Sequence, residues 1–228
     1  MHKWFGLITV TVFLTLLFSV APSSAATTVA GYSFNDNAFP DQLLSSYAPV
    51  AYPWNTDPAG TSLQAALTGS SLGKDAVSLS DSAYAVLKFN NIFVQNGPGA
   101  DLAVFELSSA GGSGGGEPVR LTINNITNTY MTYWTGYNNN GYNGAGGGSV
   151  SGVYVALIDL NDFQIPSGGL VNVIQINGVQ AWGSLGQWDT DYCVFGALNV
   201  APVPIPGALV LFLPGLVGLA AIRRRFKQ

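Results

Sequence analysis

Apolar and polar residues alternate along much of the middle of the chain, which is the pattern of half-buried β-strands. The pattern is clearest at residues 83–89, because Ala85, Leu87 and Phe89 fall on one face of an extended strand. Similar short runs predict strands at residues 26–34, 76–79, 101–107, 118–123, 129–135, 151–160, 170–176 and 191–200. Only residues 63–67 suggest a turn of helix in this region. The pattern predicts an all-β fold.

Glycine, proline and asparagine separate these runs and predict the loops. Residues 96–99 predict a tight turn, residues 111–116 a flexible glycine crossing, and residues 138–148 the tip of a hairpin. Residues 35–60 contain four prolines and predict long surface loops, with one short strand near residues 47–52. Eight or nine short strands with almost no helix predict a single β-sandwich, jelly-roll-like in its connections.

The first 25 residues have the features of a secretory signal peptide. Lys3 precedes an almost uninterrupted apolar run over residues 4–20, and small residues follow at 21–25. We therefore expect a signal helix that is cleaved after Ala25 or Ala26. A retained N-terminal anchor is the alternative.

The end of the chain joins a proline motif, an apolar segment and a basic cluster. The motif is Val203, Pro204, Ile205, Pro206 and Gly207, and the cluster is Arg223, Arg224 and Arg225. The segment 207–222 would be about 24 Å long as a helix, against about 30 Å for a bilayer core. Counting from the start of the motif gives 20 residues, which is enough to span. Arginines favour the cytoplasmic side, so the pattern predicts a transmembrane helix with the rest of the protein across the membrane.

This tail resembles the PEP-CTERM class of bacterial sorting signals, and most closely the variant whose motif reads Val-Pro-Leu-Pro-Ala. The chain differs from that motif at Ile205 and Gly207. The resemblance implies transient residence in the inner membrane of a Gram-negative bacterium, processing by an exosortase, and delivery to the cell surface or the extracellular space. It divides the chain into a signal peptide (1–25), an exported domain (26–200) and a sorting signal (201–228). An ordinary C-terminal anchor is the alternative.

A second resemblance lies inside the exported domain. Residues 92–106, with Asn-Gly-Pro-Gly-Ala-Asp-Leu-Ala-Val-Phe-Glu at their end, look like the "NGPGxDLxVFE" segment of a bacterial cell-surface β-sandwich family. Residues 158–163 and 195–199 fit later strands of the same family. The resemblance implies a fold and a location rather than a reaction.

Charge and residue usage exclude several kinds of function. Between the two targeting segments there are three basic residues against all twelve acidic ones, a net charge of −9. Such a charge disfavours nucleic acid and suits cations or neutral glycans. The only histidine, His2, leaves with the signal peptide, which removes histidine-based catalysis and zinc sites. The only cysteine, Cys193, lies in an apolar run and is expected to be a small buried hydrophobe, with an intermolecular disulfide as the alternative.

Four carboxylates next to predicted strands are candidates for calcium. They are Asp101, Glu106, Asp189 and Asp191. Calcium takes several oxygen ligands in flexible geometry. Asp101 and Glu106 are an odd number of residues apart, so they can bind one ion only if the strand begins after Asp101 or bulges. Plain solvated carboxylates are the alternative, and no other cofactor is expected.

Clustered aromatic residues are the second candidate site. Tyr133, Trp134, Tyr137 and Tyr142 crowd a short region that is also rich in asparagine. Aromatic faces can stack on sugar rings, and asparagine amides can hydrogen-bond hydroxyl groups. The same residues are equally suited to packing within a sheet.

These features favour an exported surface or matrix protein without catalytic activity, which contacts extracellular polysaccharide or has a structural role. No catalytic residue is assigned. The alternative is a glycoside hydrolase or lyase acting on that polysaccharide through paired carboxylates. The exported domain has only two glutamates, Glu106 and Glu117, and nothing in the sequence marks an aspartate pair.

Overall fold

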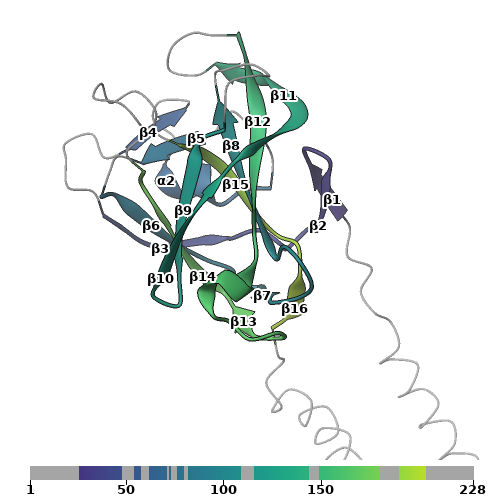
Figure 1. Ribbon diagram of the computed structural model, residues 1–228. Coiled ribbons are helices and arrows are strands. Elements are labelled where there is room, and N and C mark those ends of the chain that lie inside the picture. Colours follow the sequence, from purple (N-terminus) through teal and green to yellow (C-terminus); the bar gives the residue numbers. More distant parts are fainter. Residues whose placement is uncertain are drawn as a thin grey trace, which may run out of the picture.

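The structure, a computed structural model, describes residues 26–47, 54–57, 62–70, 72, 76–79, 82–108, 116–143, 149–179 and 190–203. These residues form antiparallel sheets with very little helix (Figure 1), so the all-β prediction is confirmed. Two larger sheets of five and six strands make up most of the fold, with a two-stranded hairpin and a three-stranded sheet beside them.

The strands of each sheet come from distant parts of the chain. The five-stranded sheet has the order β10 (Ile126–Met131), β9 (Pro118–Ile123), β14 (Val173–Asn177), β6 (Tyr84–Lys88) and β3 (Gln42–Tyr47). The six-stranded sheet has the order β11 (Tyr133–Asn143), β12 (Ser149–Ile158), β8 (Leu102–Ser108), β15 (Asp191–Ala197), β5 (Ala76–Leu79) and β4 (Trp54–Asp57). The small sheets are β1 (Ala26–Val29) with β2 (Tyr32–Asn35), and β13 (Leu170–Val171), β7 (Ile92–Gln95) and β16 (Val200–Pro202). A short helix α2 (Leu63–Leu67) and a 3₁₀ turn η1 (Leu160–Phe163) complete the described elements.

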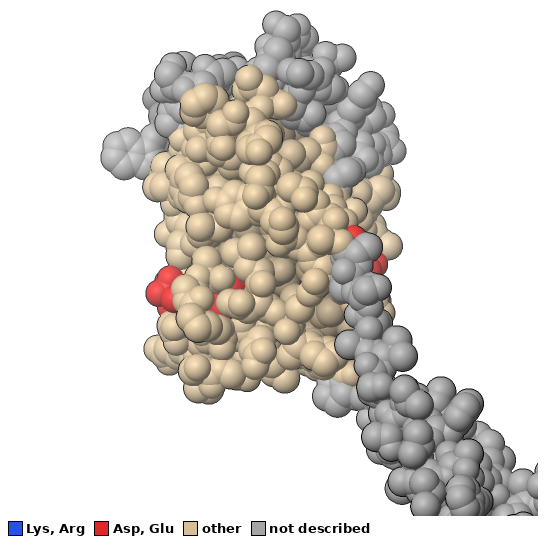
Figure 2. Space-filling model, turned by 90° about the vertical axis from the view of Figure 1, so that its right-hand side faces the viewer, with Lys and Arg blue, Asp and Glu red and all other residues tan. Residues whose placement is uncertain are grey.

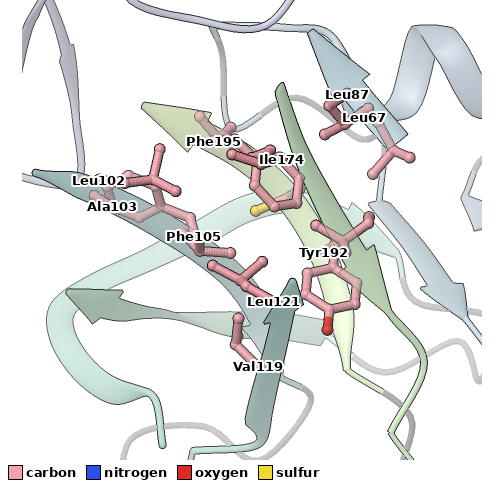
Figure 3. Packing of buried hydrophobic residues seen from close by; sticks show 14 of the residues in the cluster. Leu67, Leu87, Leu102, Ala103, Phe105, Val119, Leu121, Ile174, Tyr192 and Phe195 are labelled. Atoms are coloured by element: carbon pink, nitrogen blue, oxygen red, sulfur yellow. The ribbon is translucent and has the colours of Figure 1, made fainter. Parts of the chain in front are cut away.

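The two large sheets face each other across the main core. Alternate residues of β9 are fully buried, and the side chains between them are not, as the sequence pattern predicts. Figure 3 shows Leu121 and Ile174 from the five-stranded sheet beside Tyr192 and Phe195 of β15. The Tyr192 hydroxyl reaches across and donates to the carbonyl of Asn177 at 2.9 Å. Apolar packing and a few buried hydrogen bonds therefore join the sheets in a sandwich-like arrangement.

The central strands β8 and β15 are buried on both faces, because the β1–β2 hairpin covers the side of the six-stranded sheet that faces away from the core. The ring of Phe34 in this hairpin lies 6.0 Å from that of Phe105, at an angle of 77°. A Cβ atom on Gly196 would run into the Phe34 ring, so this contact requires glycine. Burial on both faces explains why β8 and β15 are nearly continuous apolar runs.

Cys193 lies in β15 at an irregularity in the pairing between β15 and β8. Its side chain is buried and unpaired with another cysteine, and burial raises the pKa of its thiol. This placement fits the expected role of a small hydrophobe.

Some predicted strand boundaries were wrong. Residues 26–34 form a hairpin rather than one strand, with a turn at Ala30 and Gly31, whose φ angles are 46° and 86°. Residues 42–47 form a strand in the region that was expected to be loops. Residues 129–135 are split at Thr132, where the chain passes from β10 in one sheet to β11 in the other. The predicted hairpin of β11 and β12 is present, but residues 138–143, which were expected in its tip, still belong to β11, and residues 144–148 lie outside the described residues.

Candidate functional site

Asp101 is a buried structural carboxylate. It stands just before β8, and none of its surface is exposed. One oxygen, Oδ1, accepts hydrogen bonds from the Gly97 N–H at 2.7 Å and from Asn199 Nδ2 at 2.8 Å. The other, Oδ2, accepts from the Leu160 N–H at 2.9 Å. Asp101 thus fastens the 96–99 turn, the start of η1 and the segment after β15 to one another.

Glu106 lies at the other end of β8 and is also fully buried. Its Oε2 accepts from Thr132 Oγ1 at 2.7 Å and from the Glu117 N–H at 3.4 Å. Its Oε1 has no hydrogen-bond partner among the described residues. Burial raises the pKa of Glu106 from 4.5 to about 7; the charge of Asp191 adds to the rise, and the hydrogen bonds from Thr132 and Glu117 oppose it. The Glu106 carboxyl is therefore largely protonated below neutral pH.

The structure does not bring the four calcium candidates together. Asp101 and Glu106 are five residues apart along an extended strand, about 16 Å, so one ion cannot bind both. Strand β8 does begin after Asp101, which is one of the two conditions under which Asp101 and Glu106 could share an ion. The Asp101 oxygens, however, already accept the hydrogen bonds described above. Asp189 lies outside the described residues, which contain no group of three or more histidine, cysteine or acidic side chains placed to hold a metal. Calcium near Glu106 and Asp191 stays a prediction.

The aromatic candidates on β11 point in two directions. Tyr133 shares a hydroxyl–hydroxyl hydrogen bond of 3.0 Å with Tyr32 of the β1–β2 hairpin. Tyr137 packs against the same hairpin, since a Cβ on Gly31 would lie 3.1 Å from its ring. Trp134 lies on the opposite face of the sheet from Tyr133, and it pairs there with Tyr154 of the neighbouring strand. Tyr133, Trp134 and Tyr137 are each about half exposed (45%, 46% and 52%), and the side chain of Tyr142 is outside the described residues.

The surface next to this hairpin carries little charge. Figure 2 shows the molecule from the side on which the hairpin lies in Figure 1, and the described atoms there are nearly all neutral, with acidic atoms at two places and no lysine or arginine in view. The described basic residues therefore lie on other faces.

A third surface was not singled out from the sequence, and we call it the polar face. It is the side of the five-stranded sheet that faces away from the core, and strand register defines it in three cross-strand rows. The first row is Tyr47, Tyr84, Asn177, Arg120 and Thr129; the second is Ser45, Val86, Gln175, Thr122 and Thr127; and the third is Gln42, Lys88 and Val173.

Hydrogen bonds fix the middle of the polar face. Gln175 Nε2 donates to Asn177 Oδ1 at 2.6 Å, and Asn177 Nδ2 donates to Thr122 Oγ1 at 3.0 Å. The Thr122 hydroxyl in turn shares a 2.7 Å hydrogen bond with that of Thr127. The connected amides and hydroxyls hold one another in place, so their remaining donors and acceptors are presented to a ligand in a fixed arrangement.

A pair of aromatic rings borders this network. Tyr47 and Tyr84 stack with ring centroids 5.7 Å apart and an angle of 26° between the planes. A flat aromatic edge beside fixed amides and hydroxyls is chemically suited to a ligand that has both apolar ring faces and many hydroxyl groups.

Sequence reasoning missed the polar face because it depends on register. The outward positions of β6, β9 and β14 are visible as the polar half of each alternating run. Nothing in the sequence indicates that β9 and β14 pair, because 49 residues (124–172) separate them.

Comparison with protein-family models, curated proteins and solved structures finds no match. Of the sorting motif only Val203 lies within the described part; the other motif residues, the apolar segment and the arginines lie outside it. Within the described ranges, no helix has the length and apolar character to cross a membrane.

Proposed function

We propose that the protein is an exported, non-catalytic component of the cell surface or extracellular matrix, and that its jelly-roll-like β-sandwich binds polysaccharide through the polar face. The observation that carries this proposal is the hydrogen-bonded network of Gln175, Asn177, Thr122 and Thr127 beside the stacked Tyr47–Tyr84 pair. It offers sugar hydroxyls several partners along an extended sheet surface.

The alternative of a glycoside hydrolase or lyase has less support. Its best glutamate, Glu106, is fully buried between the sheets and hydrogen-bonded to Thr132, where a polymer cannot reach it. A general acid must lie within hydrogen-bond reach of the bond that it cleaves.

Export is proposed from the two chain ends. The signal-like residues 1–25 and the proline–apolar–arginine tail support secretion, passage through the inner membrane and exosortase processing. When the full chain is expressed in a host that has an exosortase, the intact mass of the extracellular protein should correspond to a start near Ala26 and to loss of Arg223–Gln228. Recovery of the full C-terminus in the inner membrane would contradict the sorting proposal and favour a simple anchor.

Binding of polysaccharide is the second expectation. The secreted protein should be retarded in native gels that contain extracellular polysaccharide, relative to gels without it, because the polar face gives each chain many contacts. The same mixtures should release no reducing or unsaturated ends over a day. Unchanged mobility in every polysaccharide would remove the binding proposal, and product release would favour the enzyme alternative.

A further inference from the structure

Among the described residues, positive charge lies on the polar face. Lys88 is the only lysine and Arg120 the only arginine among the described residues, although the described residues extend over the whole fold. Both lie on the polar face, Lys88 opposite Val173 and Arg120 opposite Asn177. The three rows that define this face contain no carboxylate. On a domain of net charge −9, the rows themselves are therefore positively charged; the exposed carboxylate of Asp41 borders them beside Gln42, where it accepts hydrogen bonds from Asn90 and Asn91.

The two cations are spaced for an extended ligand. Lys88 is four residues from Tyr84 along β6, about 13 Å. Arg120 is two strands from Tyr84 in the same row, about 10 Å. The network of Gln175, Asn177 and Thr122 fills the area between them. A chain that crosses the sheet diagonally would meet a positive charge near each end and amides in its middle.

From this placement we propose that the polar face binds a polysaccharide that carries carboxylate groups, such as a polymer of uronic acids. The proposal rests on the function proposed above and specifies its ligand. The Arg120 guanidinium and the Lys88 ammonium each receive a carboxylate, and arginine can do so through two parallel hydrogen bonds. The amides and hydroxyls bind the sugar hydroxyls, and Tyr47 and Tyr84 contact a ring face. The overall negative charge repels polyanions everywhere else, which restricts binding to this face.

Nucleic acid is the other polyanion to consider, and the observations favour it less. A nucleic acid has a phosphate at every residue and is bound mainly by many cations, whereas this face has two.

Affinity electrophoresis with polygalacturonate and with neutral hydroxyethyl cellulose tests the proposal on the full-length secreted protein. The protein should be retarded by polygalacturonate, and added salt should weaken the retardation. The double variant Lys88→Gln/Arg120→Gln should bind polygalacturonate about tenfold more weakly. The control Thr28→Asp/Asn138→Asp makes the same change of two charge units at exposed positions away from this face, and should bind like the wild type.

The possible results distinguish the carboxylate ligand from the wider polysaccharide function. Equal binding of polygalacturonate by the wild type and the double variant would overturn the proposal, as would single-stranded DNA bound as tightly as polygalacturonate. Binding of hydroxyethyl cellulose alone would overturn the carboxylate ligand and leave the polysaccharide function standing. Binding of neither polymer, nor of any other polysaccharide, would remove both. Because the side chains of Lys88 and Arg120 lie outside the core, the double variant is expected to fold, and an unchanged melting curve checks this.

Discussion

Replacing Glu106 with glutamine should make the protein more stable than the wild type at about pH 8 and should leave the two nearly equal at about pH 4. Burial raises the pKa of Glu106 from 4.5 to about 7 in the folded protein. Between these two values the unfolded chain has lost its proton while the folded protein still holds it. Raising the pH through this window therefore favours the unfolded state, by about 3 kcal/mol in all. Glutamine has the shape of the protonated carboxyl and no such titration.

Urea unfolding of both proteins at several pH values measures this difference. The free energy of unfolding of Glu106→Gln minus that of the wild type should rise from near zero at about pH 4 to about 3 kcal/mol at about pH 8. The control is Asp36→Asn, which removes an exposed carboxylate rather than a buried one and should change the free energy of unfolding only slightly. A difference that stays flat across the window, or a variant that is less stable at pH 8, would show that the Glu106 carboxyl is not held neutral by burial.

Removal of the Asp101 side chain should change the stability by a comparable amount in the opposite direction, as a loss. Asp101→Ala leaves the Gly97 N–H, the Leu160 N–H and the Asn199 amide without their acceptor. Since buried donors without a partner are costly, the free energy of unfolding should fall by about 4 kcal/mol. Asp101→Asn retains one acceptor oxygen and should lose about half as much.

Stability measurements with and without calcium distinguish a structural role of Asp101 from a role as a calcium ligand. For each Asp101 variant, the loss of stability measured in millimolar calcium should equal the loss measured in excess chelator, because the hydrogen bonds do not involve a metal. Asp36→Ala, which removes one exposed hydrogen bond with Thr27, should lose about 1 kcal/mol or less. A loss at position 101 that appears only in calcium would mean that Asp101 binds the ion after all.

Local patterns predicted the parts of the fold that depend on alternation. Three elements lie where the sequence predicts them: the strands at 76–79 and 118–123 and the short helix at 63–67. The pattern of apolar residues directly indicates burial of every second residue in a strand, or of one face of a helix. The polar residue Glu106 inside the apolar run of β8 was also a visible sign of a buried carboxyl, although it was interpreted as a calcium ligand.

Features that depend on contacts between distant segments were not predictable in this way. The chain leaves one sheet for the other at Thr132, in a run without glycine or proline, because the Thr132 side chain binds Glu106 and the carbonyl of Glu117. The hairpin turn at Ala30 requires a left-handed φ that its residue type does not signal. The polar face depends on the pairing of β9 with β14, which no local pattern encodes.

The most direct test of the central claim, that polysaccharide binds on the polar face, compares two tyrosines with nearly equal exposure. Tyr47 on the polar face is 51% exposed, and Tyr137 beside the β1–β2 hairpin is 52% exposed. Affinity electrophoresis of Tyr47→Ala and Tyr137→Ala, each with its melting curve, isolates the two surfaces. Tyr47→Ala should weaken polysaccharide binding about tenfold, and Tyr137→Ala should leave it unchanged. Loss of binding in Tyr137→Ala, with wild-type binding in Tyr47→Ala, would contradict the account and place the sugar on β11.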